Sequence, residues 1–241
     1  MTAGSAGSGG PPDPSGSGER GWADSVEAVV FDLDGVLVDT EIWWDEVRIE
    51  FAARAGRVWT ESDRAAIMGS NTRQWRSRMR HRLQLEVSED EVERAVIDGM
   101  LERYARLGPP AIEGAVEAVH ELAGRYPLAV ASSSPPRIIE AALDGLGVRR
   151  LFRTIVSSDE VRAGKPAPDV YLLAAHRLGV RSEACLVVED SLNGVLAAKA
   201  AGMHVVLVPN VSIPPPPDAR QLADRVLARL ADLPGVLAGK D

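Results

Sequence analysis

Two aspartates, Asp32 and Asp34, lie one residue apart in the stretch VVFDLDGVLVDT, directly after an apolar run that begins at Val26. The run is typical of a buried strand. Ionised carboxylates are costly in such surroundings unless they are paired, hydrogen-bonded or bound to a metal ion. We therefore expect a neutralising group beside this pair, and a divalent cation with oxygen ligands would meet that need.

Further polar residues lie where other apolar runs end. They are Ser132, Ser133 and Ser134 at the end of PLAVAS, Lys165 in the loop AGKPAPD, and Glu189 and Asp190 after ACLVV. Ligands of parallel sheets bind at the carboxyl ends of the strands, so we expect these groups to converge with the two aspartates. Magnesium prefers hard oxygen ligands and often shares them with a phosphate. The constellation therefore predicts a phosphoryl substrate.

The elements that must position these residues alternate between strands and helices. Five short apolar runs have strand character, and they begin at Val26, Pro127, Arg153, Ala184 and His204. Most of them do not alternate with polar residues, which is typical of a parallel sheet covered by helices on both faces. The intervening helices are expected at Arg137–Leu146, Asp169–Leu178 and Ser191–Ala201. The sequence thus predicts an α/β fold with a doubly wound, Rossmann-like parallel-sheet core.

An insertion separates the first strand from the rest of this pattern. About eighty residues lie between the aspartate pair and the next helix-strand unit, far more than a crossover needs. We interpret residues 41–107 as an inserted α-helical cap domain, with Thr40 as the N-cap of its first helix. Ser88 and Glu91 form a capping box before the helical stretch VERAVIDGMLERYARL. The catalytic core then comprises residues 25–40 and 108–241.

The two ends of the chain give simpler patterns. Residues 1–24 are rich in Gly, Ser and Pro and predict a disordered tail. Near the other end, SIPPPPD at 212–218 predicts an extended linker. We expect one last amphipathic helix over Ala219–Leu233.

Composition limits the partners of this protein. The net charge of −8 would repel nucleic-acid backbones and anionic membranes, and no apolar run approaches the length of a bilayer span. We therefore expect the protein to bind neither nucleic acids nor membranes. Cys185 is the single cysteine and the N-terminus does not resemble a signal peptide, which together predict a cytoplasmic protein. We expect a monomer or small homo-oligomer that acts on a small phosphorylated metabolite.

Four motifs of the chain, in order, resemble those of the haloacid dehalogenase superfamily. They are FDLDGVLVDT, VASSS, GKPAPDVY and VVEDSLNGVLAAKAAGM. The resemblance covers essentially the whole chain apart from the N-terminal tail. It points to the phosphatase and β-phosphoglucomutase-like branch, which has a helical cap between the first two motifs. The resemblance implies a Mg²⁺-dependent phosphomonoesterase that acts on a sugar or polyol phosphate.

The resemblance also implies roles for individual residues. Asp32 would be the nucleophile that forms an aspartyl-phosphate, and Asp34 would be the general acid and base. Ser132 and the backbone N–H of Ser133 would bind phosphoryl oxygens. Lys165 would neutralise the charge that the phosphate and the nucleophile share.

The same resemblance implies a set of magnesium ligands. Mg²⁺ would bind the Asp32 carboxylate, the Asp34 backbone carbonyl and the Asp190 carboxylate. Glu189 would be a further direct ligand of the ion or would hold the direct ligands in position. The metal would offset the mutual repulsion of these acids.

The cap is expected to select the substrate, because a lid that closes over a site completes the recognition surface. The loop IMGSNTRQW at 67–75 resembles the cap specificity loop of sugar phosphatases and mutases. We expect Ser70, Asn71 and Arg73 to contact sugar hydroxyls or a second anionic group of the substrate. Trp44 is expected either to pack within the cap or to line the sugar face.

Other activities of the superfamily fit the sequence less well. Dehalogenases lack the acid that corresponds to Asp34, and phosphonatases need a cap lysine, whereas residues 41–107 contain none. The nearest alternative is a β-phosphoglucomutase-like sugar phosphomutase. Such mutases carry a cap histidine where this chain has Trp44 or its neighbour Trp43, which favours hydrolysis. A catalytically idle binding protein is a further alternative, against which the intact motif residues argue.

Overall fold

The computed structural model describes residues 21–67 and 70–239. Its strands form a single parallel sheet in the order β3-β2-β1-β4-β5-β6 within these residues. The strands are β1 (Ala28–Phe31), β2 (Leu128–Ser132), β3 (Phe152–Ser157), β4 (Cys185–Glu189), β5 (His204–Leu207) and β6 (Arg225–Val226). The chain moves outward from β1 to β3, returns to β4 and then moves outward on the other side. The order therefore reverses between β1 and β4, where sheets of this kind bind their ligands.

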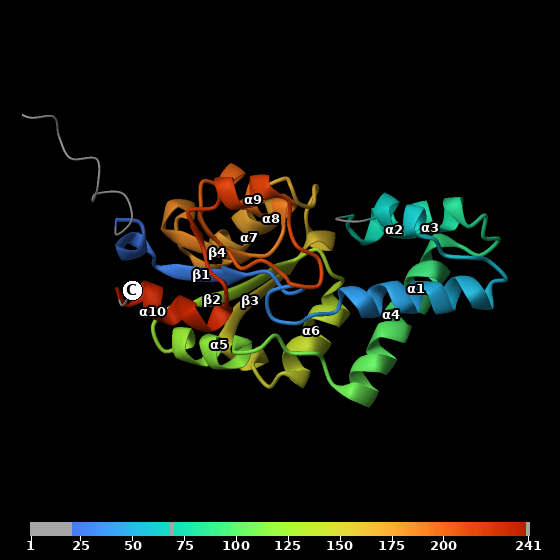
Figure 1. The fold of residues 1–241 in the computed structure, drawn as a ribbon, viewed down its shortest axis with the longest axis horizontal. Helices are drawn as coiled ribbons and strands as arrows, with labels where there is room; N and C mark the ends of the chain where they lie inside the picture. The colour runs from blue at the N-terminus through green and yellow to red at the C-terminus, as the bar shows by residue number, and fades with distance from the viewer. Residues whose placement is uncertain (1–20, 68–69, 240–241) are drawn as a thin grey trace, which may run out of the picture.

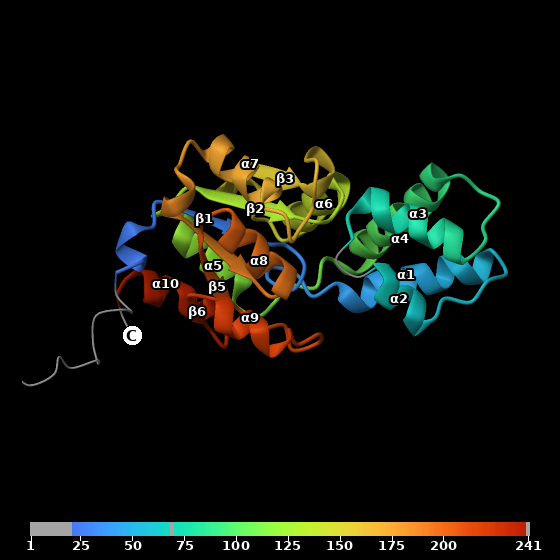
Figure 2. The same cartoon turned by 90° about the horizontal axis from the view of Figure 1, so that it is seen from above.

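Helices cover both faces of the sheet (Figures 1 and 2). The core helices are α5 (Ala115–Ala123), α6 (Pro136–Gly145), α7 (Asp169–Leu178), α8 (Leu192–Ala200), α9 (Pro217–Leu222) and α10 (Leu233–Leu237). Short 3-10 helices are η1 (Ala23–Ser25), η2 (Arg149–Leu151), η3 (Ser158–Glu160), η4 (Ser182–Ala184) and η5 (Leu230–Asp232). Among the helices described, none is both long and apolar enough to cross a bilayer.

The side chains of β1 show why the central strands are apolar throughout. Val29 and Phe31 are buried in a cluster with residues of α5, α6 and α10. Ala28 and Val30 point the other way, into a second cluster with residues of α7, α8 and α9. Successive side chains of a strand alternate between the two faces, and both faces are covered here. The predicted doubly wound α/β core is therefore confirmed.

The register of the central strands brings their carboxyl ends together. Phe31 of β1 is paired with Val130 of β2 and with Val188 of β4. The backbone N–H of Asp32 continues this pairing and donates to the carbonyl of Val188 at 3.0 Å. The residues that follow the three strands consequently lie at one edge of the sheet.

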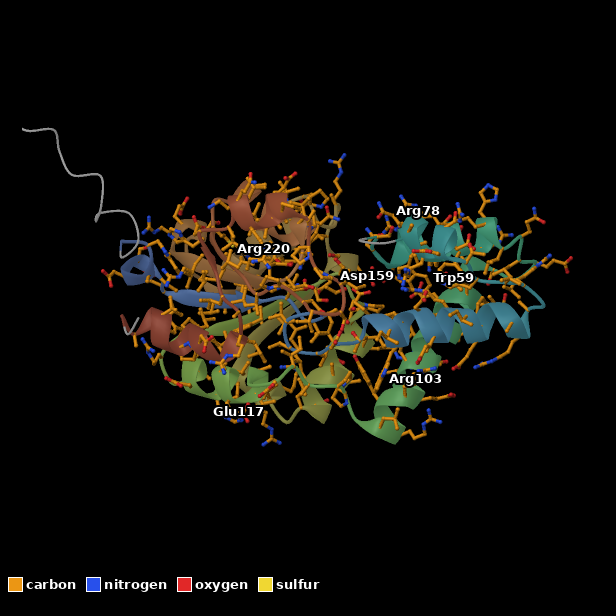
Figure 3. All side chains as sticks on the ribbon, in the orientation of Figure 1. Trp59, Arg78, Arg103, Glu117, Asp159 and Arg220 are labelled. Atoms are coloured by element: carbon orange, nitrogen blue, oxygen red, sulfur yellow. The ribbon has the colours of Figure 1, made fainter. Side chains whose placement is uncertain are left out.

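The helices α1 (Glu41–Arg54), α2 (Glu61–Ile67), α3 (Thr72–Arg82) and α4 (Glu89–Leu107) lie beside that edge (Figures 1 and 2). Ser88 caps α4 in the predicted capping box with Glu91. Arg103 of α4, which is labelled in Figure 3, forms ion pairs with Glu46 and Glu50 of α1. We refer to α1–α4 as the cap.

Two adjacent linkers join the cap to the core. The linkers pair at a β-bridge between Val38 and Ala111. The N–H of Asp39 donates to the carbonyl of Pro110 at 2.9 Å, and the N–H of Ile112 donates to Leu37 at 3.0 Å. The cap therefore leaves and re-enters the core at one place, which fits a hinge.

The predicted helix over Ala219–Leu233 is wrong. This stretch contains the end of α9, the strand β6 and the 3-10 helix η5. Val226 pairs with Leu207 at the edge of the sheet, and the Asp224 carboxylate accepts the N–H of Val205 at 2.8 Å. Pairing with β5 thus overrides the helical pattern of the sequence.

The other terminal predictions fall partly outside the structure. Residues 1–20 of the predicted tail lie outside the described residues, and η1 begins at Ala23 within the remainder. Residues 68–69 of the predicted specificity loop are also outside the described part of the chain. In the predicted linker, Pro216 has an extended backbone before α9.

Candidate active site

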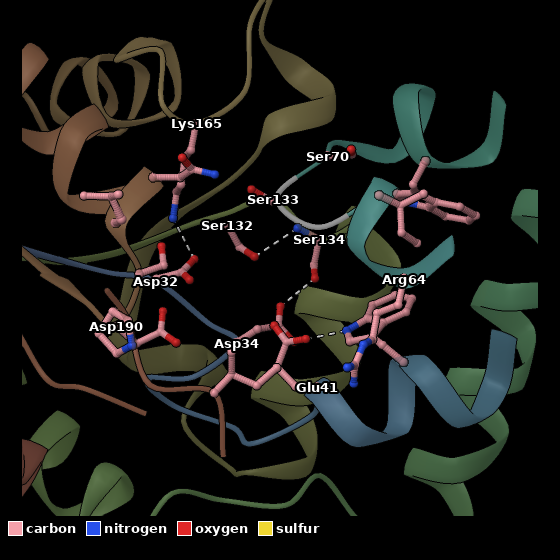
Figure 4. Close-up of a pocket in the computed structure, with 18 of the residues that line it drawn as sticks. Asp32, Asp34, Glu41, Arg64, Ser70, Ser132, Ser133, Ser134, Lys165 and Asp190 are labelled. Carbon is pink, nitrogen blue, oxygen red and sulfur yellow. Dashed lines mark hydrogen bonds and ion pairs between the residues drawn. The ribbon is translucent and has the colours of Figure 1, made fainter. Parts of the chain in front are cut away.

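A cavity of about 440 Å³ lies between the cap and the carboxyl ends of the central strands (Figure 4). Its volume is within the range typical of small-molecule sites. The core contributes the predicted residues Asp32, Asp34, Ser132, Ser133, Lys165 and Asp190. The cap contributes Glu41, Trp44, Arg48, Arg64, Ile67, Ser70 and Trp75. The structure therefore brings together residues that are far apart in the sequence.

Lys165 bridges two carboxylates at the base of the cavity. Its Nζ atom donates to Asp32 Oδ1 at 2.8 Å and to Glu189 Oε1 at 2.6 Å. The ammonium also lies 4.8 Å from the centre of the Tyr171 ring, whose hydroxyl donates to Glu189 at 2.7 Å. All of these side chains are buried. The lysine thus fixes the position of the predicted nucleophile and compensates part of its charge.

Glu189 holds the backbone around the site. Its Oε1 accepts from Lys165 and Tyr171, while Oε2 accepts the N–H of Asp190, the N–H of Ser191 and the Ser191 hydroxyl. A Cβ atom at Gly194 would lie 1.8 Å from the Glu189 carboxylate, so only glycine fits there. Glu189 therefore acts on its neighbours chiefly by positioning them.

Three carboxylates form a candidate metal site. Asp32, Glu189 and Asp190 each place an oxygen within 4.8 Å of the others. The Asp190 carboxylate accepts no hydrogen bond from any residue that the structure describes. It packs against Gly35, where φ is +84° and a Cβ atom would lie 2.0 Å from Asp190 Oδ2. Clustered hard-oxygen donors with an uncompensated carboxylate fit a magnesium ion.

Burial and mutual repulsion explain the pKa values of the cluster. Burial raises the pKa of Asp32 to about 7, because the opposing attraction of Lys165 only partly offsets it. Burial, with the charges of Glu189 and Asp32, raises the pKa of Asp190 well above its usual range. Burial alone would raise the pKa of Glu189, but the charge and hydrogen bond of Lys165 lower it. Without a further cation, the cluster therefore tends to hold a proton.

Asp34 is held by hydrogen bonds from both domains. Its Oδ2 accepts the Ser134 hydroxyl at 2.6 Å (Figure 4), and its Oδ1 accepts the indole N–H of Trp44 at 3.3 Å. The hydroxyl of Thr40 also donates to Oδ1. Thr40 precedes α1 as predicted, but its hydroxyl accepts no hydrogen bond from an N–H group of the helix and donates to Asp34.

The serine cluster follows β2 and precedes α6. The Ser132 hydroxyl is buried and accepts the backbone N–H of Ser134 at 3.0 Å. Ser133 lines the same cavity as Asp32. The three residues thus have different surroundings: Ser132 and Ser133 line the same cavity as Asp32, whereas Ser134 donates a hydrogen bond to Asp34.

Two of the predicted cap residues lie elsewhere. Asn71 and Arg73 line a second hollow beside η3, and Ser70 is the residue of their loop that lines the main cavity. The Asn71 side chain accepts the N–H of Gln74 at 3.0 Å and so caps α3. Trp44, in contrast, lines the main cavity as one of the two predicted alternatives requires.

The sequence reasoning missed Glu41, Arg48 and Arg64, which line the cavity from the cap. Glu41, Trp44 and Arg48 occur at intervals of three and four residues, so they lie on one face of α1. This spacing predicts that the three side chains lie on the same face of the helix, but it does not show which face of the helix meets the core. The proline-rich segment Ile213–Pro216 also lines the cavity, from the core side.

Comparisons with known proteins agree with this geometry. Residues 26–202 match the haloacid dehalogenase-like hydrolase family. A phosphorylated carbohydrates phosphatase of Thermotoga maritima is 36% identical over 181 residues, which cover 74% of this chain and 83% of the relative. A fructose-1-phosphate phosphatase of Escherichia coli is 34% identical over 181 residues, covering 74% of this chain and 94% of the relative.

A solved structure has a similar fold. The crystal structure of CbbY from Rhodobacter sphaeroides in complex with phosphate has a TM-score of 0.77 and 28% sequence identity to this chain. The match covers 86% of this chain and 96% of that chain. The similarity therefore extends over the cap as well as the core.

The contact between Gly35 and Asp190 leads to a first prediction. Gly35→Ala should destabilise the fold by about 1–3 kcal/mol through backbone strain and should displace Asp190, so that Mg²⁺ no longer raises the melting temperature. Gly56→Ala is the matched control, because Gly56 has φ +67° but nothing within 4 Å of an added Cβ. A normal Mg²⁺ response in the Gly35 variant would contradict the assignment of Asp190 as a ligand.

The raised pKa of Asp32 leads to a second prediction. A carboxyl whose folded pKa lies above its unfolded value stabilises the fold at low pH, and this contribution is lost as the pH rises through about 7. A bound divalent cation should offset that loss, since it favours the ionised form. Differential scanning fluorimetry should show a larger Mg²⁺-induced rise in melting temperature at pH 8 than at pH 6.

The control for this measurement is Asp32→Asn, which should weaken the pH dependence of the Mg²⁺ effect. Equal Mg²⁺ effects at both pH values in the unmodified protein would show that protons and metal do not compete for this cluster.

Proposed function

The chain belongs to the haloacid dehalogenase-like hydrolase family, and we propose that it hydrolyses the monophosphate ester of a small sugar or polyol through an aspartyl-phosphate. The observation that carries this proposal is the convergence of Asp32, Lys165 and Asp190 at one cavity with the serines that end β2. The relatives named above are phosphatases of phosphorylated carbohydrates, which supports the choice of substrate class.

In the proposed first step, Asp32 attacks the phosphorus atom of the ester. One Asp32 oxygen is held by Lys165, and the other accepts no hydrogen bond from the described residues. As the bond from Asp32 to phosphorus forms, the bond from phosphorus to the ester oxygen breaks. That oxygen takes a proton from Asp34 and leaves as an alcohol.

In the proposed second step, a water molecule attacks the aspartyl-phosphate. Asp34, now ionised, accepts a proton from the water as the new oxygen–phosphorus bond forms. The bond between Asp32 and phosphorus breaks, which releases inorganic phosphate and regenerates the carboxylate. The hydrogen bonds that Asp34 accepts from Ser134, Thr40 and Trp44 support its role as the base of this step, because they favour the ionised carboxylate and hold it in place.

Charge on the phosphoryl group needs compensation during both steps. We assign Lys165, the Ser132 hydroxyl and the backbone N–H of Ser133 to this task. Asp32 and Asp190 would bind Mg²⁺, and Glu189 would hold the backbone of Asp190 in position. The bound ion would compensate the negative charge of the phosphoryl oxygens. Lys165 and Glu189 also keep the nucleophile in register when the substrate is absent.

The surroundings of Asp34 favour hydrolysis over the mutase alternative. The resemblance places a histidine of the mutases at Trp43 or Trp44, and here the Trp44 indole contacts Asp34 directly. An indole N–H can donate a hydrogen bond but cannot exchange a proton as histidine does. Trp44 therefore cannot control the protonation of Asp34 in the way that a histidine at this position could.

The proposal predicts phosphate release that depends on Asp32. With Mg²⁺, the protein should release phosphate from some members of a panel of sugar, polyol and nucleotide monophosphates. Asp32→Asn should reduce kcat/KM by roughly three orders of magnitude or more, because it removes the nucleophile. Asp144→Asn, an exposed position on α6, is the matched control and should leave the rate unchanged.

Isomer formation must be followed in the same reactions. Isomerisation of a sugar phosphate without release of phosphate would replace the proposal with the mutase. Turnover of unchanged rate in the Asp32 variant would rule out the aspartyl-phosphate mechanism.

A further inference from the structure

Arg48 is a charged side chain of the cavity that the proposed chemistry does not use. It lies on α1, one helical turn after Trp44, and lines the cavity from the cap. Its Nε atom is buried and has no hydrogen-bond partner among the described residues. The guanidinium lies over two indole rings, 5.1 Å from the centre of Trp44 and 5.8 Å from that of Trp75.

No carboxylate in the described part of the chain forms an ion pair with Arg48. Burial lowers its pKa to about 10, against the attraction of Glu41, Asp45 and Asp34, so the group remains charged at neutral pH. Arg64, the other arginine that lines the cavity, differs in this respect. It pairs with Glu61 at 3.4 Å and lies 4.0 Å from Asp45.

An unpaired guanidinium in such a place is costly. Its buried Nε–H has lost its contact with water, and none of its five N–H donors has an acceptor among the described residues. Contacts with the faces of indole rings do not use the N–H donors of a guanidinium, so these donors remain to be satisfied. An acceptor that enters the cavity with the substrate would satisfy them.

The surroundings of Arg48 favour a charged acceptor. Trp44 and Trp75 contact the guanidinium, and the same cavity is lined by Ile67 and by the apolar core segment Ile213–Pro216, as well as by the charged side chains of Glu41 and Arg64. Proline has no backbone N–H, so the three prolines of that segment add no donors. A charge-assisted, bidentate contact is strong where apolar groups reduce contact with water.

We propose that Arg48 binds a second anionic group, a carboxylate or a second phosphate, on the leaving group of the substrate. This inference rests on the proposed phosphatase function and narrows its substrate class to phosphomonoesters whose leaving group is itself negatively charged. Arg48 is then the residue that selects the leaving group, while Lys165 serves the phosphoryl group that is transferred.

The test compares esters that differ in this second charge. Phosphate release is measured with fructose 1-phosphate against fructose 1,6-bisphosphate, and with glycerol 3-phosphate against 3-phosphoglycerate. The first pair probes a second phosphate and the second pair probes a carboxylate. The variant is Arg48→Gln, and Arg54→Gln is the matched control, because Arg54 lies on the same helix with its side chain 69% exposed.

Arg48→Gln should lower kcat/KM by roughly ten- to hundredfold for the doubly anionic ester of at least one pair, with less than a threefold change for its singly phosphorylated partner. Arg54→Gln should change neither value. An equal loss for both members of each pair, or no loss for any of them, would overturn the assignment of Arg48 while phosphate release still supports the proposed function.

A binding measurement separates this inference from failure of the catalytic proposal. Calorimetric titration of the same four esters into Asp32→Asn, with and without Arg48→Gln, reports recognition in the absence of turnover. Tighter binding of a doubly anionic ester that depends on Arg48 supports the inference even if the unmodified protein releases no phosphate. Binding that is independent of Arg48 overturns it. Melting temperatures of all variants confirm that each of them is folded.

Discussion

The buried ammonium of Lys165 allows two carboxylates, Asp32 and Glu189, to share the base of one cavity. Burial alone would lower the pKa of this lysine, but the two neighbouring carboxylates raise it, so the ammonium stays charged. Glu189 in turn holds the backbone that leads to Asp190. Removal of Lys165 would leave uncompensated buried charge, which is strongly destabilising. The positions of the proposed nucleophile and of the candidate metal ligands therefore depend on one cation.

A second set of contacts connects this centre with the cap. Asp34 accepts hydrogen bonds from Ser134 in the core, from Thr40 in the linker and from Trp44 in the cap. Trp44 also contacts Arg48, so the proposed acid and the proposed leaving-group contact share one tryptophan. The cap can thus place a substrate and orient the proton donor at the same time. The two linkers to the cap are paired at one place, between Val38 and Ala111, which suits a lid that closes over a site.

The sequence was sufficient for strands β1–β5 and for the residues at the base of the cavity, because those features depend on local patterns. Strands buried on both faces are apolar throughout, and Asp32 and Asp190 follow such strands directly. The cap was harder to predict, because spacing on a helix does not reveal which face meets the core. Arg48 was missed for that reason, and Asn71 was assigned to the substrate although it caps α3. The strand β6 was missed because its pairing with β5 is a long-range contact.

The most direct test of the account is to locate the phosphoryl group during turnover. The unmodified protein is mixed with Mg²⁺ and a substrate found in the panel, quenched in acid within milliseconds, digested and analysed by mass spectrometry. The account predicts a phosphoryl group on the peptide that contains Asp32, removable by hydroxylamine as an acyl phosphate. A phosphoryl group on another residue, or none on Asp32 in rapidly quenched active enzyme, would contradict it.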